Sequence, residues 1–283
     1  MIVFRTKAEL ARFAAETRRA GKVIGLVPTM GYLHAGHMSL VDTARARADV
    51  VIVTLFVNPA QFGPNEDLDR YPRDFDRDRK MCEEHGVDVL FAPEASEMYA
   101  PGSSTWIEET DLARPLCGAS RPGFYRGVTT VVGKLFHLAQ PDFACFGLKD
   151  AQQCFVIERM VRDLDFQVKI IPCPLIRDAD GLALSSRNRY LSDDERKRAL
   201  AIHRALLEGR RALEEQGAKN VAGICAKAAE TITAAGGRVD YVEALDRATL
   251  KAPTAETREV LLAAAAFFGT TRLIDNELVV LKA

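Results

Sequence analysis

The sequence lacks most of the features that mark secreted, membrane-bound and nucleic-acid-binding proteins. Its six cysteines form no CxxC pair and no CxxH spacing, so we expect reduced thiols that pack as small apolar groups. The longest apolar runs, Val50–Val57 and Val260–Phe268, are far shorter than the roughly 20 residues of a membrane span. The N-terminal residues lack the charged-then-apolar pattern of a signal peptide, and 38 Lys and Arg against 39 Asp and Glu leave no overall basic field. We therefore expect a cytoplasmic protein that binds neither a membrane nor a nucleic acid.

The chain is long enough to form a substantial hydrophobic core. With 283 residues, of which 48% are apolar, it can bury about three quarters of its unfolded surface in one large or two modest domains. The apolar share also excludes a disordered chain. No repeat or low-complexity linker divides the sequence, so a domain boundary has to be found from a change in hydrophobic periodicity.

The first half begins with a strand, a helix and a second strand. Val23–Val27 is a short apolar run between Gly21 and Pro28, which is typical of a buried strand. Apolar residues at helical spacing follow from about Gly36, and Val50–Val57 then forms an uninterrupted, β-branched run. This spacing predicts a βαβ unit with parallel strands and a right-handed crossover.

The same alternation continues up to about residue 177. Strands are predicted at Val87–Phe91, Phe143–Phe146 and Val168–Ile171, with a helix at Thr129–Leu138. We therefore predict a fold of the α/β class, in which a doubly wound parallel sheet forms a Rossmann-like nucleotide-binding domain over residues 1–177.

The pattern changes after Arg177. Ser192 and Glu195 form the sequence signature of a capping box, which predicts a long helix after Ser192, and a second helix is predicted near 219–235. The end of the chain has three predicted strands, at Val239–Leu245, Val260–Phe268 and Arg272–Val280. We predict that residues 178–283 form a smaller C-terminal domain of the α+β class, which acts as a lid.

The sharpest chemical signal is a pair of histidines between the first predicted strand and the following helix. His34 and His37 lie three residues apart, so on a helix they share one face and could reach the same phosphates. Gly31 permits an unusual turn, and Gly36 lets a ligand approach the start of the helix. Open parallel sheets bind ligands at this position, and a helix N-terminus attracts phosphate.

Two alternatives to a phosphate site remain for this pair. One histidine could cap the helix while the other lies on the surface. A zinc site is the weaker alternative, because two histidines supply only two ligands and no adjacent Cys, Asp or Glu completes the set.

The histidine pair resembles the signature of the HIGH-type nucleotidyltransferase superfamily, whose members bind ATP at this turn and transfer its adenylyl group. Four motifs in the same order resemble one family within it, pantothenate synthetase, over about residues 24–191. The motifs are Pro28–Gly31, Phe56–Phe62, Phe146–Gln153 and Asp180–Asn188. Two positions depart from the family pattern: Phe124 stands where the family usually has a histidine, and Leu148 replaces an acidic residue.

The resemblance implies that ATP drives the condensation of (R)-pantoate with β-alanine, giving AMP and pyrophosphate through a pantoyl-adenylate. The attacking carboxylate is already an anion, so the step needs in-line positioning and neutralisation of charge rather than a general base. The donors implied for this task are His34, His37, Lys149, Ser185, Ser186 and Arg187, with His37 as the proton donor. The implied ATP-binding residues are Met30, Gly31, Tyr32, Leu33, His34, Ala35, Gly36, His37, Gly147, Leu148, Lys149, Asp150, Ile176, Leu184, Ser185, Ser186 and Arg187.

Neutral amides are the implied contacts for the organic acid. Gln61 and Gln153 match the pantoate-binding glutamines of the family, and the position of Gln61 is also associated with β-alanine. An amide can hydrogen-bond hydroxyl and carboxylate oxygens without a large desolvation cost. Asn58 and Tyr71 complete the predicted substrate contacts; the alternative for Gln61 is a capping or turn residue.

Ser185–Arg187 lies at the predicted domain junction. We expect a flexible loop that closes over the triphosphate and excludes water from the adenylate. The alternative is a polar interdomain linker.

No protein metal site is predicted. Magnesium is expected to bind mainly through the nucleotide phosphates, since Mg²⁺ keeps several waters and needs few protein ligands. The charged stretch Glu66–Glu84, which includes Asp76 and Asp78, is interpreted as a largely solvated helix face, with an indirect role toward magnesium as the alternative.

Three other functions compete with this interpretation. Another nucleotidyltransferase would share the histidine turn but would not explain Asn58–Gln61 or Lys149–Gln153. An aminoacyl-tRNA synthetase is disfavoured because no segment remains for a tRNA-binding module. A non-catalytic nucleotide sensor would not need Lys149 and Ser185–Arg187. The family resemblance also implies a homodimer.

Overall fold

The computed structural model describes residues 1–64 and 66–282, which form two compact units. The first unit consists of Met1–Thr110, Arg121–Leu148 and Gln153–Pro174. The second consists of Asp111–Ser120, Lys149–Gln152 and the chain from Leu175 onward. The division predicted at residue 177 differs from this one because it assigns residues 111–120 and 149–152 to the first domain. Ala283, the last residue of the predicted second domain, lies outside the described residues.

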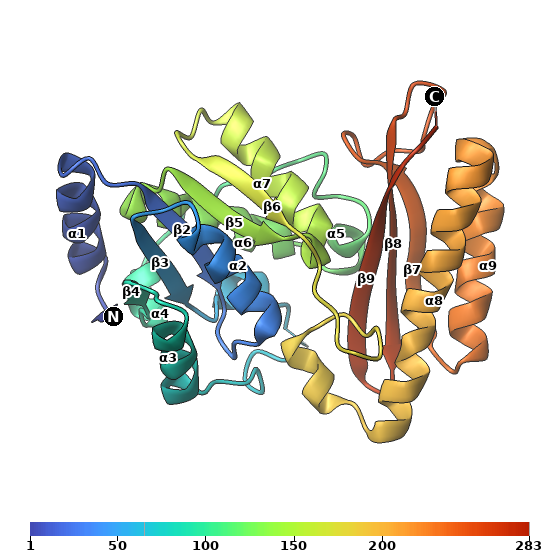
Figure 1. The fold of residues 1–283 in the computed structure, drawn as a ribbon, viewed down its shortest axis with the longest axis horizontal. Coiled ribbons are helices and arrows are strands. Elements are labelled where there is room, and N and C mark those ends of the chain that lie inside the picture. The colour runs from blue at the N-terminus through green and yellow to red at the C-terminus, as the bar shows by residue number, and fades with distance from the viewer. Residues whose placement is uncertain (65, 283) are drawn as a thin grey trace. The chain divides into compact units, whose positions relative to one another are not determined.

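The first unit is built on a six-stranded parallel sheet with the strand order β1-β4-β3-β2-β5-β6 (Figure 1). Its central pair, β2 and β3, is parallel over its whole length, as the βαβ pattern predicted. The sheet confirms the predicted fold class of this half. The strands are β1 (Ile2–Phe4), β2 (Ile24–Thr29), β3 (Val50–Leu55), β4 (Val89–Phe91), β5 (Phe143–Gly147) and β6 (Lys169–Cys173).

Helices flank this sheet and bury its apolar residues. Helix α2 packs Met38, Val41 and Ala44 against Val51 and Val53 of β3 in one core cluster. Helices α1 and α6 contact each other and β2. The helices of this unit are α1 (Lys7–Arg19), α2 (Ala35–Arg45), α3 (Phe75–Glu84), α4 (Ala95–Met98), α6 (Phe124–Ala139) and most of α7 (Ala151–Asp163), together with the 3₁₀ helix η1 (Pro59–Gln61).

Several elements of this unit were not predicted from the sequence, among them the short helix α4. Strand β1 has only three residues and pairs with β4 alone, so it carries little periodic signal. Helix α1 has a full capping box, with the Thr6 hydroxyl accepting from the backbone of Glu9 and the Glu9 carboxylate accepting from the backbone of Thr6. This motif is visible in the sequence and could have identified the helix. Helix α7 was also not predicted.

The second unit contains a three-stranded antiparallel sheet with the order β7-β8-β9. Its strands are β7 (Arg238–Asp246), β8 (Glu259–Phe268) and β9 (Thr271–Val280). Its helices are α5 (Cys117–Ser120), α8 (Asp193–Gln216) and α9 (Val221–Ala234), with 3₁₀ helices η3 (Ser186–Tyr190) and η4 (Gly217–Asn220); the 3₁₀ turn η2 (Leu148–Asp150) lies where the two units join along the chain. The capping box predicted at Ser192 and Glu195 is confirmed. The predicted α+β character of this half is therefore also confirmed.

One apolar cluster holds the second unit together. Ile202 and Leu206 of α8 and Ile232 of α9 are fully or almost fully buried and pack with Leu262 and Phe268 of β8. Burying side chains of this size contributes roughly 1.5–3 kcal/mol each. Helices α8 and α9 and the sheet therefore share one hydrophobic core.

The six cysteines, all among the described residues, are free thiols; five are buried and Cys225 is half-buried. In the part of the chain that the structure describes, no helix combines the length and the apolar character that a membrane crossing requires.

Candidate active site

The first unit places three predicted site segments at one edge of its sheet. Strand β2 lies between β3 and β5, and the register pairs Thr29, the last residue of β2, with Leu55, the last residue of β3. The segments that follow β2, β3 and β5 therefore leave the sheet at its carboxyl edge. Because the chain order reverses at β2, this position is the topological switch point at which open α/β sheets bind ligands.

The turn after β2 has an unusual backbone that a buried carboxylate holds. Gly31 has φ +88° and Tyr32 has φ +50°, a conformation that side chains other than glycine rarely adopt. One oxygen of Asp78 accepts the Tyr32 N–H at 2.6 Å, and the other accepts the Leu33 N–H at 2.7 Å. The Asp78 side chain comes from α3 and shapes the turn on which the sequence predicts ATP binding.

Most residues of Glu66–Glu84 are exposed or half-buried, as predicted for a largely solvated face, but Asp78 is an exception. Asp78 is only 2% exposed, whereas Asp76 on the same helix is exposed. Burial raises the pKa of Asp78, while the two backbone N–H groups and Arg77 act in the opposite direction. The carboxylate is retained inside the fold because it satisfies two backbone donors that would otherwise be buried without acceptors.

Helix α2 begins directly after this turn, with His34 as its N-cap residue. The His34 N–H donates to Nδ1 of His37 at 3.3 Å, and the two rings lie 4.0 Å apart between centroids. Because a backbone N–H cannot accept, a neutral His37 must carry its proton on Nε2, where it can be donated to a ligand. The side chain of Leu33 is fully buried in the core, so only its backbone could contact a nucleotide.

The segment after β3 forms a buried amide cluster around Asn58. Its Oδ1 accepts from the Ala60 N–H at 3.2 Å and from the Tyr99 hydroxyl at 2.9 Å. Its Nδ2 donates to the Gly127 carbonyl at 3.0 Å and to Oε1 of Gln61 at 3.0 Å. The backbone of Ala60 can only donate and that of Gly127 can only accept here, so the orientation of the Asn58 amide is fixed.

The fixed amide of Asn58 in turn fixes that of Gln61. Since Oε1 of Gln61 already accepts from Asn58, its Nε2 edge points the other way, where it donates to Sδ of Met30 at 3.0 Å. Arg121 holds the Gln61 carbonyl at 3.2 Å and forms a two-point ion pair with Glu66 at 2.5 and 2.6 Å. Asn58, not Gln61, is the capping residue of η1.

The predicted substrate residues Tyr71 and Gln153 lie in different surroundings. Tyr71 is 5% exposed and contacts Phe62 edge to face, with 5.8 Å between ring centroids. Gln153 is half-buried on α7. The neighbouring Gln152 is buried and donates to the carbonyls of Leu112 and Pro115 within the second unit, which is a structural role.

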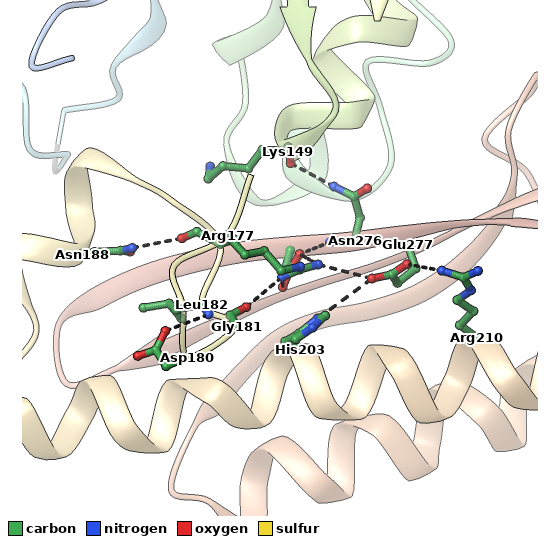
Figure 2. A network of polar contacts seen from close by, with 12 residues as sticks. Lys149, Arg177, Asp180, Gly181, Leu182, Asn188, His203, Arg210, Asn276 and Glu277 are labelled. Carbon is green, nitrogen blue, oxygen red and sulfur yellow. Dashed lines mark hydrogen bonds and ion pairs between the residues drawn. The ribbon is translucent and has the colours of Figure 1, made fainter. Parts of the chain in front are cut away.

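The remaining predicted residues belong to the second unit, apart from Gly147 and Leu148, which end β5 and begin η2. Nζ of Lys149 lies 3.4 Å from the Asp150 carboxylate, so Asp150 can orient the Lys149 side chain. The Lys149 carbonyl accepts a hydrogen bond from the Asn276 side chain at 2.9 Å (Figure 2). Among the described residues, no three His, Cys, Asp or Glu side chains are grouped so that they could hold a metal ion.

The chain around Ser185–Arg187 is more regular than the flexible loop that the sequence suggested. The Leu184 N–H donates to the Ile176 carbonyl at 3.0 Å, and Arg177 bridges to Ala183, so residues 176–184 form a tight hairpin. Ser185 then caps η3 by accepting from the Arg187 N–H at 3.3 Å. Short-range hydrogen bonds of this kind leave no periodic pattern in the sequence.

The structural roles of several residues that shape the site were not found from the sequence. Asp78, Tyr99, Arg121 and Gly127 act through backbone and amide groups of the predicted residues. Tyr99 lies 41 residues from Asn58 along the chain, and Gly127 lies 69 residues from it. A single sequence carries no signal for such pairs.

Comparison with known proteins identifies the family of the chain. The model of the pantoate–β-alanine ligase family matches residues 2–278. The pantothenate synthetase of Thermotoga neapolitana is 51% identical over 277 residues, which cover 98% of this chain and 99% of the relative. The crystal structure of pantothenate synthetase from Thermus thermophilus superimposes with a TM-score of 0.91 at 45% identity, covering 98% of this chain and 99% of that one.

A third relative has been solved with ligands. The crystal structure of pantoate–β-alanine ligase from Francisella tularensis, a complex with β-γ ATP and β-alanine, has a TM-score of 0.80 at 34% identity and covers 98% of this chain and 97% of that one. These likenesses extend over the whole chain rather than over the nucleotide-binding half alone. The chain belongs to the pantoate–β-alanine ligase family.

Proposed function

We propose that this chain condenses (R)-pantoate with β-alanine, using ATP and releasing AMP and pyrophosphate. The observation that carries the proposal is the Met30–His37 turn at the switch point of the sheet, with the oriented amide of Gln61 bonded to Met30. The relatives that match the whole chain are pantothenate synthetases, and one solved relative is a complex with ATP and β-alanine.

In the first step, a pantoate carboxylate oxygen attacks the α-phosphorus of ATP. A new O–P bond forms while the bond to the leaving pyrophosphate breaks, so negative charge grows on the pyrophosphate side. Hydrogen-bond donors stabilise this charge best when they are already aimed at it. The Nε2–H of His37 and the N-terminus of α2 are donors of this kind, and we assign to His37 the transfer of a proton toward the phosphates.

The amides of the first unit are the proposed pantoate contacts. Gln61 offers an N–H edge that the buried Asn58 holds in place, which suits the hydroxyl and carboxylate oxygens of pantoate. Gln153 would add a second amide, and Tyr71 would line the same substrate. Because Asn58 is 1% exposed and already makes four hydrogen bonds, we assign it a supporting role behind Gln61.

In the second step, the β-alanine amine attacks the acyl carbon of the pantoyl-adenylate. The amide C–N bond forms, the bond from the acyl carbon to the phosphate oxygen breaks, AMP leaves and the amine loses a proton. We assign the neighbourhood of Gln61 to β-alanine as well. Excluding water matters at this stage, since water would hydrolyse the adenylate.

Basic and hydroxyl donors of the second unit complete the proposed adenylation machinery. Lys149, Ser185, Ser186 and Arg187 would neutralise the phosphates, and the 176–188 segment would act as a lid over bound nucleotide. The remaining proposed nucleotide contacts are Met30, Gly31, Tyr32, Leu33, His34, Ala35, Gly36, Gly147, Leu148, Asp150, Ile176 and Leu184.

Magnesium fits this site as a companion of the nucleotide rather than as a resident ion. Mg²⁺ bound to phosphates keeps several waters and needs few protein ligands. When bound, the ion would neutralise phosphate charge. We also propose a homodimer, which the family resemblance supports, and a cytoplasmic location, which the free cysteine thiols support.

Exchange of radiolabelled pyrophosphate into ATP tests the proposed function. We expect exchange that depends on added pantoate and that is suppressed without it, because the adenylate forms reversibly before β-alanine reacts. Exchange that needs a different acid would identify another nucleotidyltransferase. No exchange with any acid, despite ATP binding, would identify a nucleotide sensor.

Replacing Arg187 with alanine separates the lid from a simple binding role. We expect the Arg187→Ala variant to lower the adenylation rate about a hundredfold, typical of a lost charge-stabilising donor, and to weaken ATP binding far less. Single-turnover adenylate formation and equilibrium ATP titration measure the two effects. Arg189→Ala, two residues along the same short helix, is the matched control and should change neither. Equal losses of rate and affinity in the Arg187 variant would contradict the lid.

A further inference from the structure

Strand β9 carries three consecutive polar side chains, Asp275, Asn276 and Glu277, that the proposed mechanism does not use (Figure 2). Successive side chains of a strand point to opposite faces, so Asp275 and Glu277 share the face of Leu273, which packs in the core with α8 and α9. Asn276 points to the other face. Asp275 is only 4% exposed. A buried ionised group costs desolvation energy, so its presence calls for a role other than packing.

Arg177 connects Asp275 and Glu277 to the 176–184 hairpin, of which it is part. Its guanidinium makes a two-point ion pair with Asp275, at 2.6 and 3.0 Å, and reaches Glu277 at 3.3 Å. The same guanidinium donates to the Gly181 carbonyl at 3.2 Å, across the turn of the 176–184 hairpin. Because bidentate arginine–carboxylate pairs fix orientation as well as distance, β9 sets the position of the hairpin.

Asn276 makes the corresponding connection to Lys149. Its Nδ2 donates to the Lys149 carbonyl at 2.9 Å, and Figure 2 shows its amide directed toward that carbonyl. Its own backbone N–H donates to Oδ1 of Asp275 at 2.8 Å. That oxygen also accepts from Arg177, so one carboxylate joins the support of Lys149 to the support of the hairpin.

Helix α8 supports the other end of this group. Arg210 lies 3.3 Å from the second oxygen of Glu277, and Nδ1 of His203 lies 4.0 Å from the first. Burial, followed by the charge of Arg177, lowers the pKa of His203. His203 therefore remains neutral near pH 7 and does not compete with Arg177 for Glu277.

We propose that Asn276 and Asp275 are positioning residues for the adenylation step. Asn276 holds the backbone of Lys149, and Asp275 holds, through Arg177, the hairpin that leads to Ser185–Arg187. Both act through these groups and touch no substrate. This inference rests on the proposed function, because it assumes that Lys149 and Ser185–Arg187 act on the nucleotide.

A double-mutant cycle between Asn276 and Lys149 tests the proposal. We expect Asn276→Ala to lower the rate of pyrophosphate exchange about tenfold or more, with the KM for pantoate within about twofold, since the displaced Lys149 is assigned to the nucleotide phosphates and not to pantoate. In a Lys149→Ala background, the same change should have less than about a twofold further effect, because it would act through a side chain that is already absent. Equal losses in both backgrounds would overturn the proposal.

Two further measurements test the proposal if the first variants cannot be assayed. If exchange by the Lys149→Ala variant is too slow to measure, the same double-mutant cycle is carried out on the dissociation constant of a non-hydrolysable ATP analogue. Asn276→Asp keeps the side-chain size but places an oxygen against the Lys149 carbonyl, so it should reproduce the loss even if Asn276→Ala folds poorly. An Asn276→Asp variant with wild-type exchange would contradict the inference.

A control variant and the exchange activity of the wild-type chain show whether the proposed function or only the role of Asn276 is wrong. Glu259→Gln changes one charge on the neighbouring strand β8, where the carboxylate is 46% exposed, and should retain wild-type exchange and stability. If the wild-type chain shows no pantoate-dependent exchange, the proposed function fails. If the wild type is active and Lys149→Ala is impaired, but the cycle is additive, only the role of Asn276 fails.

Discussion

Replacing Gly127 with alanine is expected to reduce pantoate-dependent pyrophosphate exchange by at least about a hundredfold, mainly through a higher KM for pantoate. A Cβ atom at this position would collide with the Ala60 carbonyl and lie 2.7 Å from the Gln61 backbone nitrogen. Backbone cannot move aside as a flexible side chain can, so η1 would shift. The Gly127 carbonyl also accepts from Asn58, whose amide orients that of Gln61. The substitution therefore displaces the proposed substrate amide by two routes.

The same helix provides a matched control for this variant. A Cβ atom on Gly133 would come closest to Cδ1 of Ile107, at 2.5 Å, at the flexible end of a side chain. Alanine is also the better helix former by about 1 kcal/mol, so Gly133→Ala should keep its activity and much of its stability. Steady-state kinetics and thermal unfolding of both variants separate a local displacement from general unfolding. A Gly127→Ala enzyme with near-normal KM for pantoate would show that η1 does not hold Gln61.

Replacing Asp78 with asparagine is expected to weaken ATP binding about tenfold to a hundredfold. The two carboxylate oxygens accept from the backbone N–H groups of Tyr32 and Leu33, and an amide can offer only one oxygen to them. The NH₂ group would then face a backbone donor, and a buried donor without an acceptor costs about 1–3 kcal/mol. Tyr32 would lose the contact that holds its left-handed backbone, and the turn before His34 would relax.

Asp76→Asn is the matched control, since it changes an exposed aspartate two residues away on the same helix. Equilibrium titration with a non-hydrolysable ATP analogue measures the effect, and the KM for pantoate should change much less. Comparable affinities in the two variants would mean that the turn keeps its shape without Asp78. If only the affinity for pantoate fell, Asp78 would support the pantoate site, and its proposed role in ATP binding would be contradicted.

The fold was largely predictable because its signals are local and periodic. The apolar runs around Val23–Val27 and Val50–Val57 correspond to β2 and β3, and the Ser192 capping box correctly marked the start of α8. Such elements are specified by neighbouring residues along the chain. Strand β1, by contrast, exists because β4 pairs with it, and three residues are too few to show a period.

The position of the site was also predictable, but the residues that hold its backbone in place were not. The histidine turn could be assigned to a strand–helix junction from the sequence, and the structure has α2 starting at Ala35. The contact of Asp78 with this turn could not be found in the same way, because Asp78 lies within a strongly charged stretch whose other members are mostly exposed. Its burial depends on the approach of α3 to a turn more than 40 residues away, as their hydrogen bonds show.

The division of the chain into two units could also be predicted only in part. Periodicity changes near residue 177, but the short segments 111–120 and 149–152 associate with the second unit through contacts such as those of Lys251 with Asp111 and of Asn276 with Lys149. Segments of four to ten residues are too short for periodicity to assign. The roles given to Lys149 and Ser185–Arg187 therefore remain predictions that the exchange assays test.

The orientation of the Gln61 amide has a consequence for the design of inhibitors. A ligand group opposite this side chain meets an N–H edge, so a ketone, ether or sulfonyl oxygen should be accepted there in place of a hydroxyl. An ammonium or a primary amide presented through its nitrogen should be rejected, because Gln61 cannot rotate without breaking its bond to Asn58. Exchanging a single heteroatom in a pantoate mimic at this position should therefore distinguish tight from weak inhibitors.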